Sequence, residues 1–138
     1  THIPFLVVAP GVTTAESRCD QPVDLTTVYP TLLELCDLPA DPECEGISLV
    51  PLLKNPNAEW SQPALMTWLQ GNHAVRSKNW RFIQYRDGTE ELYDCRQDPH
   101  EETNLASDPA NQQILKELRQ YLPEKNMAQV TDMKKPKE

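Results

Sequence analysis

The sequence predicts an α/β chain in which one buried strand and a helix are followed by a small four-stranded antiparallel sheet with a covering C-terminal helix. Three observations predict this class. An uninterrupted apolar run opens the chain at residues 3–9, and several short β-type runs separated by turn residues occupy its middle. An amphipathic helical pattern lies close to its end.

Composition narrows the functional classes before any motif is considered. The 138 residues carry a formal net charge of −8 and are 38% hydrophobic, which favours one domain of modest core, with room for a small second lobe. The apolar run is far shorter than the roughly 20 residues that a membrane-spanning helix needs, so no membrane span is predicted. The acidic balance argues against nucleic acid as a partner, because phosphate binding needs a basic surface.

The opening run has no polar alternation, which is typical of a strand buried on both faces of a parallel sheet. Pro10-Gly11 ends it, and no second run of this kind follows. We therefore expect the strand to belong to a larger sheet, and the chain, which begins with Thr1, to be part of a longer protein. The alternative is a complete small domain from which a leader has been removed.

Residues 24–36 have the pattern of a helix. Asp24 is a suitable N-cap, and apolar side chains recur after it at helical spacing. The members of this face are Leu25, Val28, Leu32, Leu35 and Cys36. Pro30 should kink the helix or divide it into a first turn and a main helix. A short apolar turn of helix is expected at residues 49–53, ended by Asn55.

Four short strands should follow, because β-branched and aromatic residues alternate with turn signals. The predicted strands are residues 64–68, 73–77, 80–85 and 90–94. Gly71-Asn72 marks the first turn, and Asp87-Gly88 signals a two-residue hairpin.

The last helix has the clearest pattern. Asp108 is its expected N-cap and Pro109 its first residue, while Pro123 should end it. Its apolar face consists of Ile114, Leu115, Leu118 and Leu122. The predicted organisation is thus an α/β part (1–60), a sheet-and-helix subdomain (61–123) and a flexible tail (124–138).

The four cysteines form no CxxC pair, and the three histidines lack zinc-finger spacing, so a zinc site is not predicted. Cys36 and Cys44 flank a short loop that a disulfide could close. In the alternative, all four cysteines are thiols that act as small apolar groups.

One short segment is a candidate binding site, because Asn72, His73 and Arg76 could together hold an oxyanion such as sulfate, phosphate or carboxylate. In the alternative they form a strand-end turn with a surface histidine and a structural arginine. Trp60, Trp68 and Trp80 either form a sugar-stacking platform or anchor the sheet against its helix. The sequence contains no phosphate loop, nucleophile elbow or HExxH motif, so no complete active site is predicted.

Several segments together resemble, in order and spacing, the C-terminal third of type I sulfatases of the alkaline phosphatase superfamily. The first are Thr1-His2-Ile3-Pro4-Phe5, Val8-Ala9-Pro10-Gly11, the helix at 24–36, and Gly46-Ile47-Ser48-Leu49-Val50-Pro51-Leu52-Leu53. The later ones are Ala74-Val75-Arg76, Trp80-Arg81-Phe82-Ile83, Glu91-Leu92-Tyr93-Asp94, Asp98-Pro99-His100-Glu101 and Asn104-Leu105-Ala106. The Thr-His-x-Pro start and the Gly-Asn-His segment are most similar to the iduronate-2-sulfatase-like branch.

The resemblance implies that the chain ends an alkaline-phosphatase-like α/β sandwich and lends a rim to the cleft of a hydrolase of sulfated sugars. It implies an upstream core as partner, with a formylglycine made from a C/S-x-P-x-R motif and a calcium ion, and an extracytoplasmic location. None of the four cysteines stands in that motif, so no cofactor is expected on this chain alone, and Asn72, His73 and Arg76 become expected substrate-binding residues. The alternatives are a non-catalytic module that binds glycan or protein, or part of a related phosphodiesterase or phosphonate hydrolase.

Overall fold

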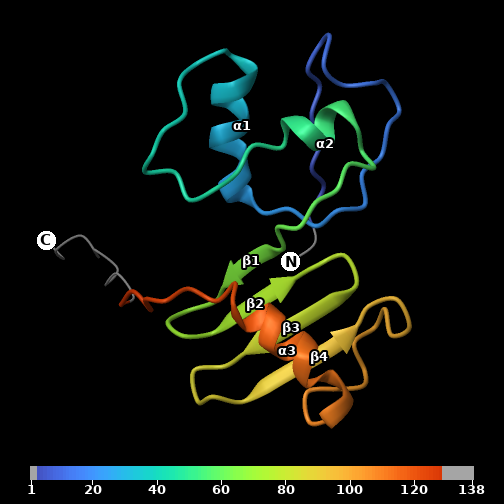
Figure 1. The fold of residues 1–138 in the computed structure, drawn as a ribbon, viewed down its shortest axis with the longest axis vertical. Coiled ribbons are helices and arrows are strands. Elements are labelled where there is room, and N and C mark those ends of the chain that lie inside the picture. Colours follow the sequence, from blue (N-terminus) through green and yellow to red (C-terminus); the bar gives the residue numbers. More distant parts are fainter. Residues whose placement is uncertain (1–2, 129–138) are drawn as a thin grey trace, which may run out of the picture. The chain divides into compact units, whose positions relative to one another are not determined.

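The computed structural model describes residues 3–128 (Figure 1). The chain divides into two compact units, Thr1–Gln62 and Pro63–Glu138, and each is described by itself. No helix among the described residues is long and apolar enough to cross a membrane.

The opening apolar segment of the first unit is the main difference from the expected fold. Residues 3–9 form no strand, and Leu6 and Val8 are each 88% exposed. The predicted strand is therefore absent among the described residues of this chain, while its place in a larger sheet stays a prediction. A strand requires a hydrogen-bonded neighbour, and no described segment pairs with this one. Its end is fixed only by a turn, in which the backbone N–H groups of Val12 and Thr13 donate to the carbonyl of Ala9 at 3.0 and 2.9 Å.

The predicted helix at 24–36 forms in two parts, a 3₁₀ turn η1 (Leu25–Thr27) and α1 (Val28–Leu35). Asp24 is the N-cap, and its Oδ1 accepts from Thr26 N at 3.0 Å. The division falls just before Pro30, which lies in the first turn of α1, where its missing N–H removes no helical hydrogen bond. The predicted apolar face is not covered: Leu25 and Leu32 are exposed.

The buried side of η1 and α1 is formed by threonines. The Thr31 hydroxyl donates to the carbonyl of Thr27 at 2.6 Å and accepts from Leu49 N at 2.8 Å. This hydroxyl thereby joins α1 to the start of α2 (Val50–Lys54), the expected apolar turn, which ends at Asn55.

The second unit contains the predicted sheet. Its strands are β1 (Ala64–Thr67), β2 (His73–Arg76), β3 (Trp80–Gln84) and β4 (Glu90–Asp94), antiparallel in the order β1-β2-β3-β4. All four lie within their predicted ranges. The register pairs Val75 with Phe82 and Phe82 with Leu92, so the buried side chains of three strands share one face.

A 3₁₀ turn, η2 (Pro109–Asn111), leads into α3 (Gln112–Arg119), which crosses this face in Figure 1. Asp108 caps the turn as predicted, accepting from Ala110 N at 2.9 Å. The expected apolar face is confirmed. The core consists of Val75, Phe82, Leu92, Leu115 and Leu118, with Ile114 and Leu122 packed against it.

The hairpin between β3 and β4 has a three-residue loop, not the predicted two-residue one. Gly88 N donates to Tyr85 O, and Tyr85 N donates to Thr89 O, each at 2.9 Å. Gly88 has φ +87°, which is the left-handed residue that follows a turn in three-residue loops. The Asp-Gly dipeptide located the hairpin, but it occurs in both loop types.

A loop covers the outer edge of β4. Leu105 N donates to Leu92 O at 2.8 Å, and Asn104 Oδ1 accepts from Leu92 N at 3.0 Å. Asn104 Nδ2 also donates to Glu90 O at 3.2 Å. Outward-facing backbone groups of this strand are therefore satisfied by side chain and loop.

The four cysteines are free, so the Cys36–Cys44 disulfide does not form. Most of the predicted tail, residues 129–138, lies outside the described residues. Its beginning includes Asn126, whose contacts belong to the candidate site below.

Candidate functional site

His73 opens β2 and is only 5% exposed. Its Nδ1 lies 2.9 Å from Thr67 Oγ1 on the paired strand, and its Nε2 lies 2.6 Å from Asn126 Oδ1. An amide oxygen can only accept, so Nε2 donates to Asn126. His73 is thus a buried imidazole whose two ring nitrogens both have hydrogen-bond partners, not the surface histidine of the structural alternative.

Asn72 joins two turns at the same end of the sheet. Its Nδ2 donates to Trp68 O at 3.0 Å, and its Oδ1 accepts from Arg86 N at 3.2 Å. The turn between β1 and β2 is thereby fixed to the turn between β3 and β4.

Arg76 lies at the opposite end of β2 from His73 and, three residues along a strand, on the opposite face. Its Nη1 donates to carbonyl groups of the next turn, those of Ser77, Lys78 and Trp80. The structure therefore brings Asn72 and His73 together and keeps Arg76 apart from them. Arg76 holds the turn between β2 and β3, and a substrate role for the three residues stays a prediction.

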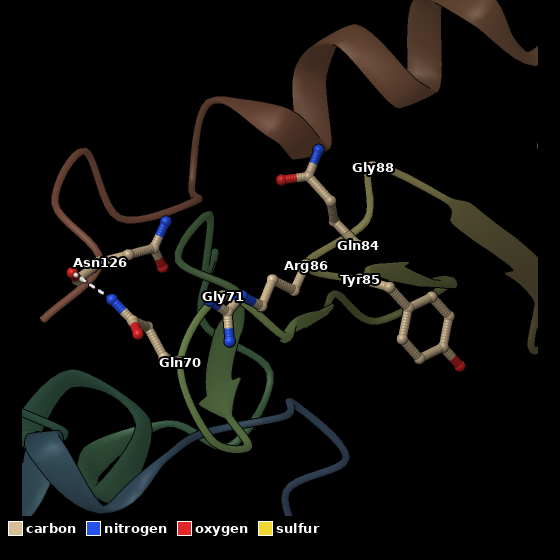
Figure 2. Close-up of a pocket in the computed structure, with 7 residues that line it drawn as sticks. All are labelled: Gln70, Gly71, Gln84, Tyr85, Arg86, Gly88 and Asn126. Atoms are coloured by element: carbon tan, nitrogen blue, oxygen red, sulfur yellow. Dashed lines mark hydrogen bonds between the residues drawn. The ribbon is translucent and has the colours of Figure 1, made fainter. Parts of the chain in front are cut away.

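Beside Asn72 and His73 lies a depression of about 320 Å³ (Figure 2). It is lined by Gln70, Gly71, Gln84, Tyr85, Arg86, Gly88 and Asn126. Figure 2 shows the Arg86 side chain running beside Gly71 and the Tyr85 ring pointing away from Gln70 and Asn126.

Arg86 differs from the other arginines of residues 3–128, because no acidic group or carbonyl binds its guanidinium. Arg76 binds carbonyl groups, whereas Arg18, Arg81, Arg96 and Arg119 each pair with a carboxylate. Neither Arg86 nor Asn126 was a predicted site residue. The only feature that could have indicated this site is the exposed arginine of the β3–β4 hairpin, Arg86.

The shifted ionisable groups of the sheet belong to ion pairs and hydrogen bonds that hold it together. Hydrogen bonds from Arg119 hold the pKa of Glu90 below its ordinary value, and those from Arg96 do the same for Asp94. Burial, aided by a hydrogen bond to Glu91, raises the pKa of Tyr93 to about 12. This phenol therefore stays protonated at neutral pH and cannot act as a base there.

The described residues do not fit the metal centre and nucleophile that the sulfatase resemblance implies. Within residues 3–128 no three His, Cys, Asp or Glu side chains gather into a possible metal site, and no cysteine stands in a C/S-x-P-x-R motif.

Two of the tryptophans have clear and different surroundings. Trp80 packs against the core, with the Arg96 guanidinium 5.5 Å from its ring centre, whereas Trp68 is 76% exposed. The anchoring role is confirmed for Trp80 and is wrong for Trp68.

Comparisons with known proteins agree on one family. The family model for the C-terminal region of N-sulphoglucosamine sulphohydrolase matches residues 1–128. A sulfatase of Formosa agariphila is 36% identical over 126 residues, covering 91% of this chain and 25% of the relative. A Delta 4,5-hexuronate-2-O-sulfatase of Bacteroides thetaiotaomicron is 32% identical over 133 residues, covering 88% of this chain and 28% of the relative.

A solved structure of a 2-O GAG sulfatase superimposes with a TM-score of 0.60 at 30% identity, covering 80% of this chain and 26% of that one. The chain thus spans about a quarter of the length of the curated relatives it matches. Fold, motif order and sequence identity lead to the same conclusion: this chain belongs to the family of sulfatase C-terminal regions within the alkaline phosphatase superfamily.

Proposed function

We propose that this chain is the C-terminal part of an enzyme that hydrolyses sulfate esters on sugars, and that it completes the fold and forms part of the rim of the substrate cleft. The observation that carries the proposal is the family match over residues 1–128, together with the identity to a hexuronate-2-O-sulfatase. A sulfated uronate-containing saccharide is accordingly the proposed substrate class.

The exposed apolar surface of the first unit supports a role within a larger protein. Ile3, Phe5, Leu6 and Val8 are all exposed in one continuous segment. Burying apolar surface gains about 25 cal/mol per Å², and a β-type segment without a neighbour gains its missing hydrogen bonds by entering a sheet. We propose that the upstream core of the enzyme supplies that sheet.

The chemistry is assigned to that upstream core, which we propose to contain the formylglycine and the calcium site. The described residues of this chain fit neither, so no catalytic step is placed on them. Within the proposal, Asn72 shapes the rim by holding the backbone of Arg86 and His73 by holding the side chain of Asn126, and Arg76 holds the turn between β2 and β3.

The test is a chimera of the Bacteroides hexuronate-2-O-sulfatase in which this chain replaces the segment that aligns with it. Sulfate release from a 2-O-sulfated unsaturated uronate disaccharide is measured, with the enzyme lacking that segment as control. We expect the chimera to release sulfate and the shortened enzyme to release none. A folded, monodisperse chimera that hydrolyses no sulfate ester contradicts the proposal.

A matched variant tests the role of the opening segment. Leu6→Asp with Val8→Asp should abolish folding of the chimera, because both side chains would be buried as charges in the completed sheet. In the isolated chain the same changes should leave the melting temperature unaltered, since both side chains are already exposed. An isolated chain that melts cooperatively as a monomer, with an active chimera unaffected by these substitutions, favours a stand-alone binding module.

A further inference from the structure

The depression beside the β1–β2 and β3–β4 turns presents hydrogen-bond donors that the protein itself does not use. The Arg86 guanidinium has no acidic partner within residues 3–128. Asn126 uses its Oδ1 to accept from His73, which leaves the amide Nδ2 without a bond to a described residue. Both side chains line the same depression.

Two features of the turns hold Arg86 at this place. Its backbone N–H donates to Asn72 Oδ1 at 3.2 Å. The stem of its side chain lies over Gly71, where an added Cβ would be 3.2 Å from Arg86 Cγ and 3.3 Å from Arg86 Cβ. Because Gly71 also has φ +82°, a larger residue there would strain the turn and displace the arginine.

Asn126 is held in place by two residues of the β1–β2 hairpin. The bond from His73 Nε2 to its Oδ1 sets which way the amide faces, and Gln70 Nε2 donates to its backbone carbonyl at 3.4 Å (Figure 2). The Gln70 Oε1 remains as an acceptor on the wall of the depression. The depression therefore combines a cation, an amide donor and an amide acceptor.

We propose that this depression binds the oxyanion of an acidic saccharide, with the Arg86 guanidinium and the Asn126 amide as donors and Gln70 as acceptor for a sugar hydroxyl. A guanidinium binds sulfate or carboxylate through two parallel N–H groups, and the amides suit the remaining polar groups of a sugar ring. The donors in the depression are the reason to propose an oxyanion as the bound group. That a saccharide carries this oxyanion rests on the proposed function.

The surrounding charge is compatible with this role. The neighbouring Asp87 does not line the depression, and its Oδ1 accepts from Thr89 N at 2.9 Å and from Thr89 Oγ1 at 2.7 Å. Glu90 is neutralised by Arg119. The net charge of −8 opposes the approach of an anion, so binding depends on the local donors and should weaken when added salt screens them.

The test is an NMR titration of the isotopically labelled 138-residue chain. The ligands are inorganic sulfate, a 2-O-sulfated uronate disaccharide, the same disaccharide without sulfate, and a neutral disaccharide. We expect saturable shifts at residues 70–72, 86–88 and 126 with the sulfated disaccharide, and none with the neutral one. Comparing the two uronate disaccharides distinguishes the sulfate from the carboxylate as the bound oxyanion.

Three variants make the test specific. Arg86→Gln should weaken binding by about tenfold or more, as loss of a charge-assisted hydrogen bond predicts. Gly71→Ala should weaken it without changing the net charge, by displacing Arg86. Arg18→Gln, which removes the same charge from an exposed site in the first unit, should leave the affinity unchanged.

Unaltered affinity in Arg86→Gln, equal binding of the neutral disaccharide, or the absence of saturable shifts would each overturn the proposal. These outcomes are separate from the fate of the proposed function. A chain that binds no oxyanion could still complete an active chimera, and an inactive chimera leaves the titration result intact.

Discussion

Truncation of Leu115 should reveal how much of the stability of the second unit comes from packing α3 on the sheet. Leu115 is completely buried against Val75, Phe82 and Leu92. Leu115→Ala removes an isopropyl group, worth about 2.4 kcal/mol at roughly 0.8 kcal/mol per methylene, and the cavity left behind adds about 1 kcal/mol. We expect the free energy of unfolding to fall by about 3–4 kcal/mol, out of a total of about 5–15 kcal/mol for a domain.

The assay is urea unfolding of the full chain, followed by tryptophan fluorescence, to which Trp80 on the same core contributes. Lys116→Ala is the matched control, because its side chain is exposed on the same helix and should change stability by at most about 0.5 kcal/mol. Similar losses for the two variants, or a loss below about 1 kcal/mol for Leu115→Ala, would refute the packing of α3 on the sheet.

Two further predictions concern the outer strand of the sheet. Arg119 lowers the pKa of Glu90 below its ordinary 4.5, so the ion pair stabilises the fold above that pH and is lost as the pH falls through the lowered value. Glu90→Gln should therefore lower the free energy of unfolding by about 1 kcal/mol at pH 7. Unfolding curves at decreasing pH should show this difference in stability between the variant and the native chain disappearing. A difference that stays constant with pH contradicts the assignment. Asn104→Ala leaves Leu92 N and Glu90 O without their partner. We therefore expect the free energy of unfolding to fall by about 1–3 kcal/mol and the Leu92 amide to exchange its hydrogen faster. Unchanged exchange at Leu92 would show that the loop is not needed to protect this strand edge.

Elements determined by local pattern were predictable. The four strands and α3 follow from alternation or helical spacing around one core, and the caps at Asp24 and Asp108 follow from side chains that accept from nearby backbone N–H groups. The segment at 3–9 has the composition of a strand but forms none here, because a strand depends on a neighbour that the described residues do not supply. Its expected place in a larger sheet stays a prediction.

The candidate site shows the same division between local and tertiary information. The turn that carries Asn72 and His73 made these two residues candidates for a binding site from the sequence alone. Their partners in the structure, Arg86 and Asn126, lie far along the chain. That no carboxylate of the described residues binds the Arg86 guanidinium is a property of the folded chain. Asn126 falls in a segment that has no motif and was expected to be flexible, so no sequence signal singled it out.

The loop along β4 bears on how this protein avoids self-association. Exposed strand edges recruit strands from other molecules, which leads to aggregation and fibre formation. Here the carboxamide of Asn104 and the amide of Leu105 occupy the positions at which an incoming strand would bind Leu92. The Asn104 side chain thus blocks the addition of a further strand at this edge of the sheet.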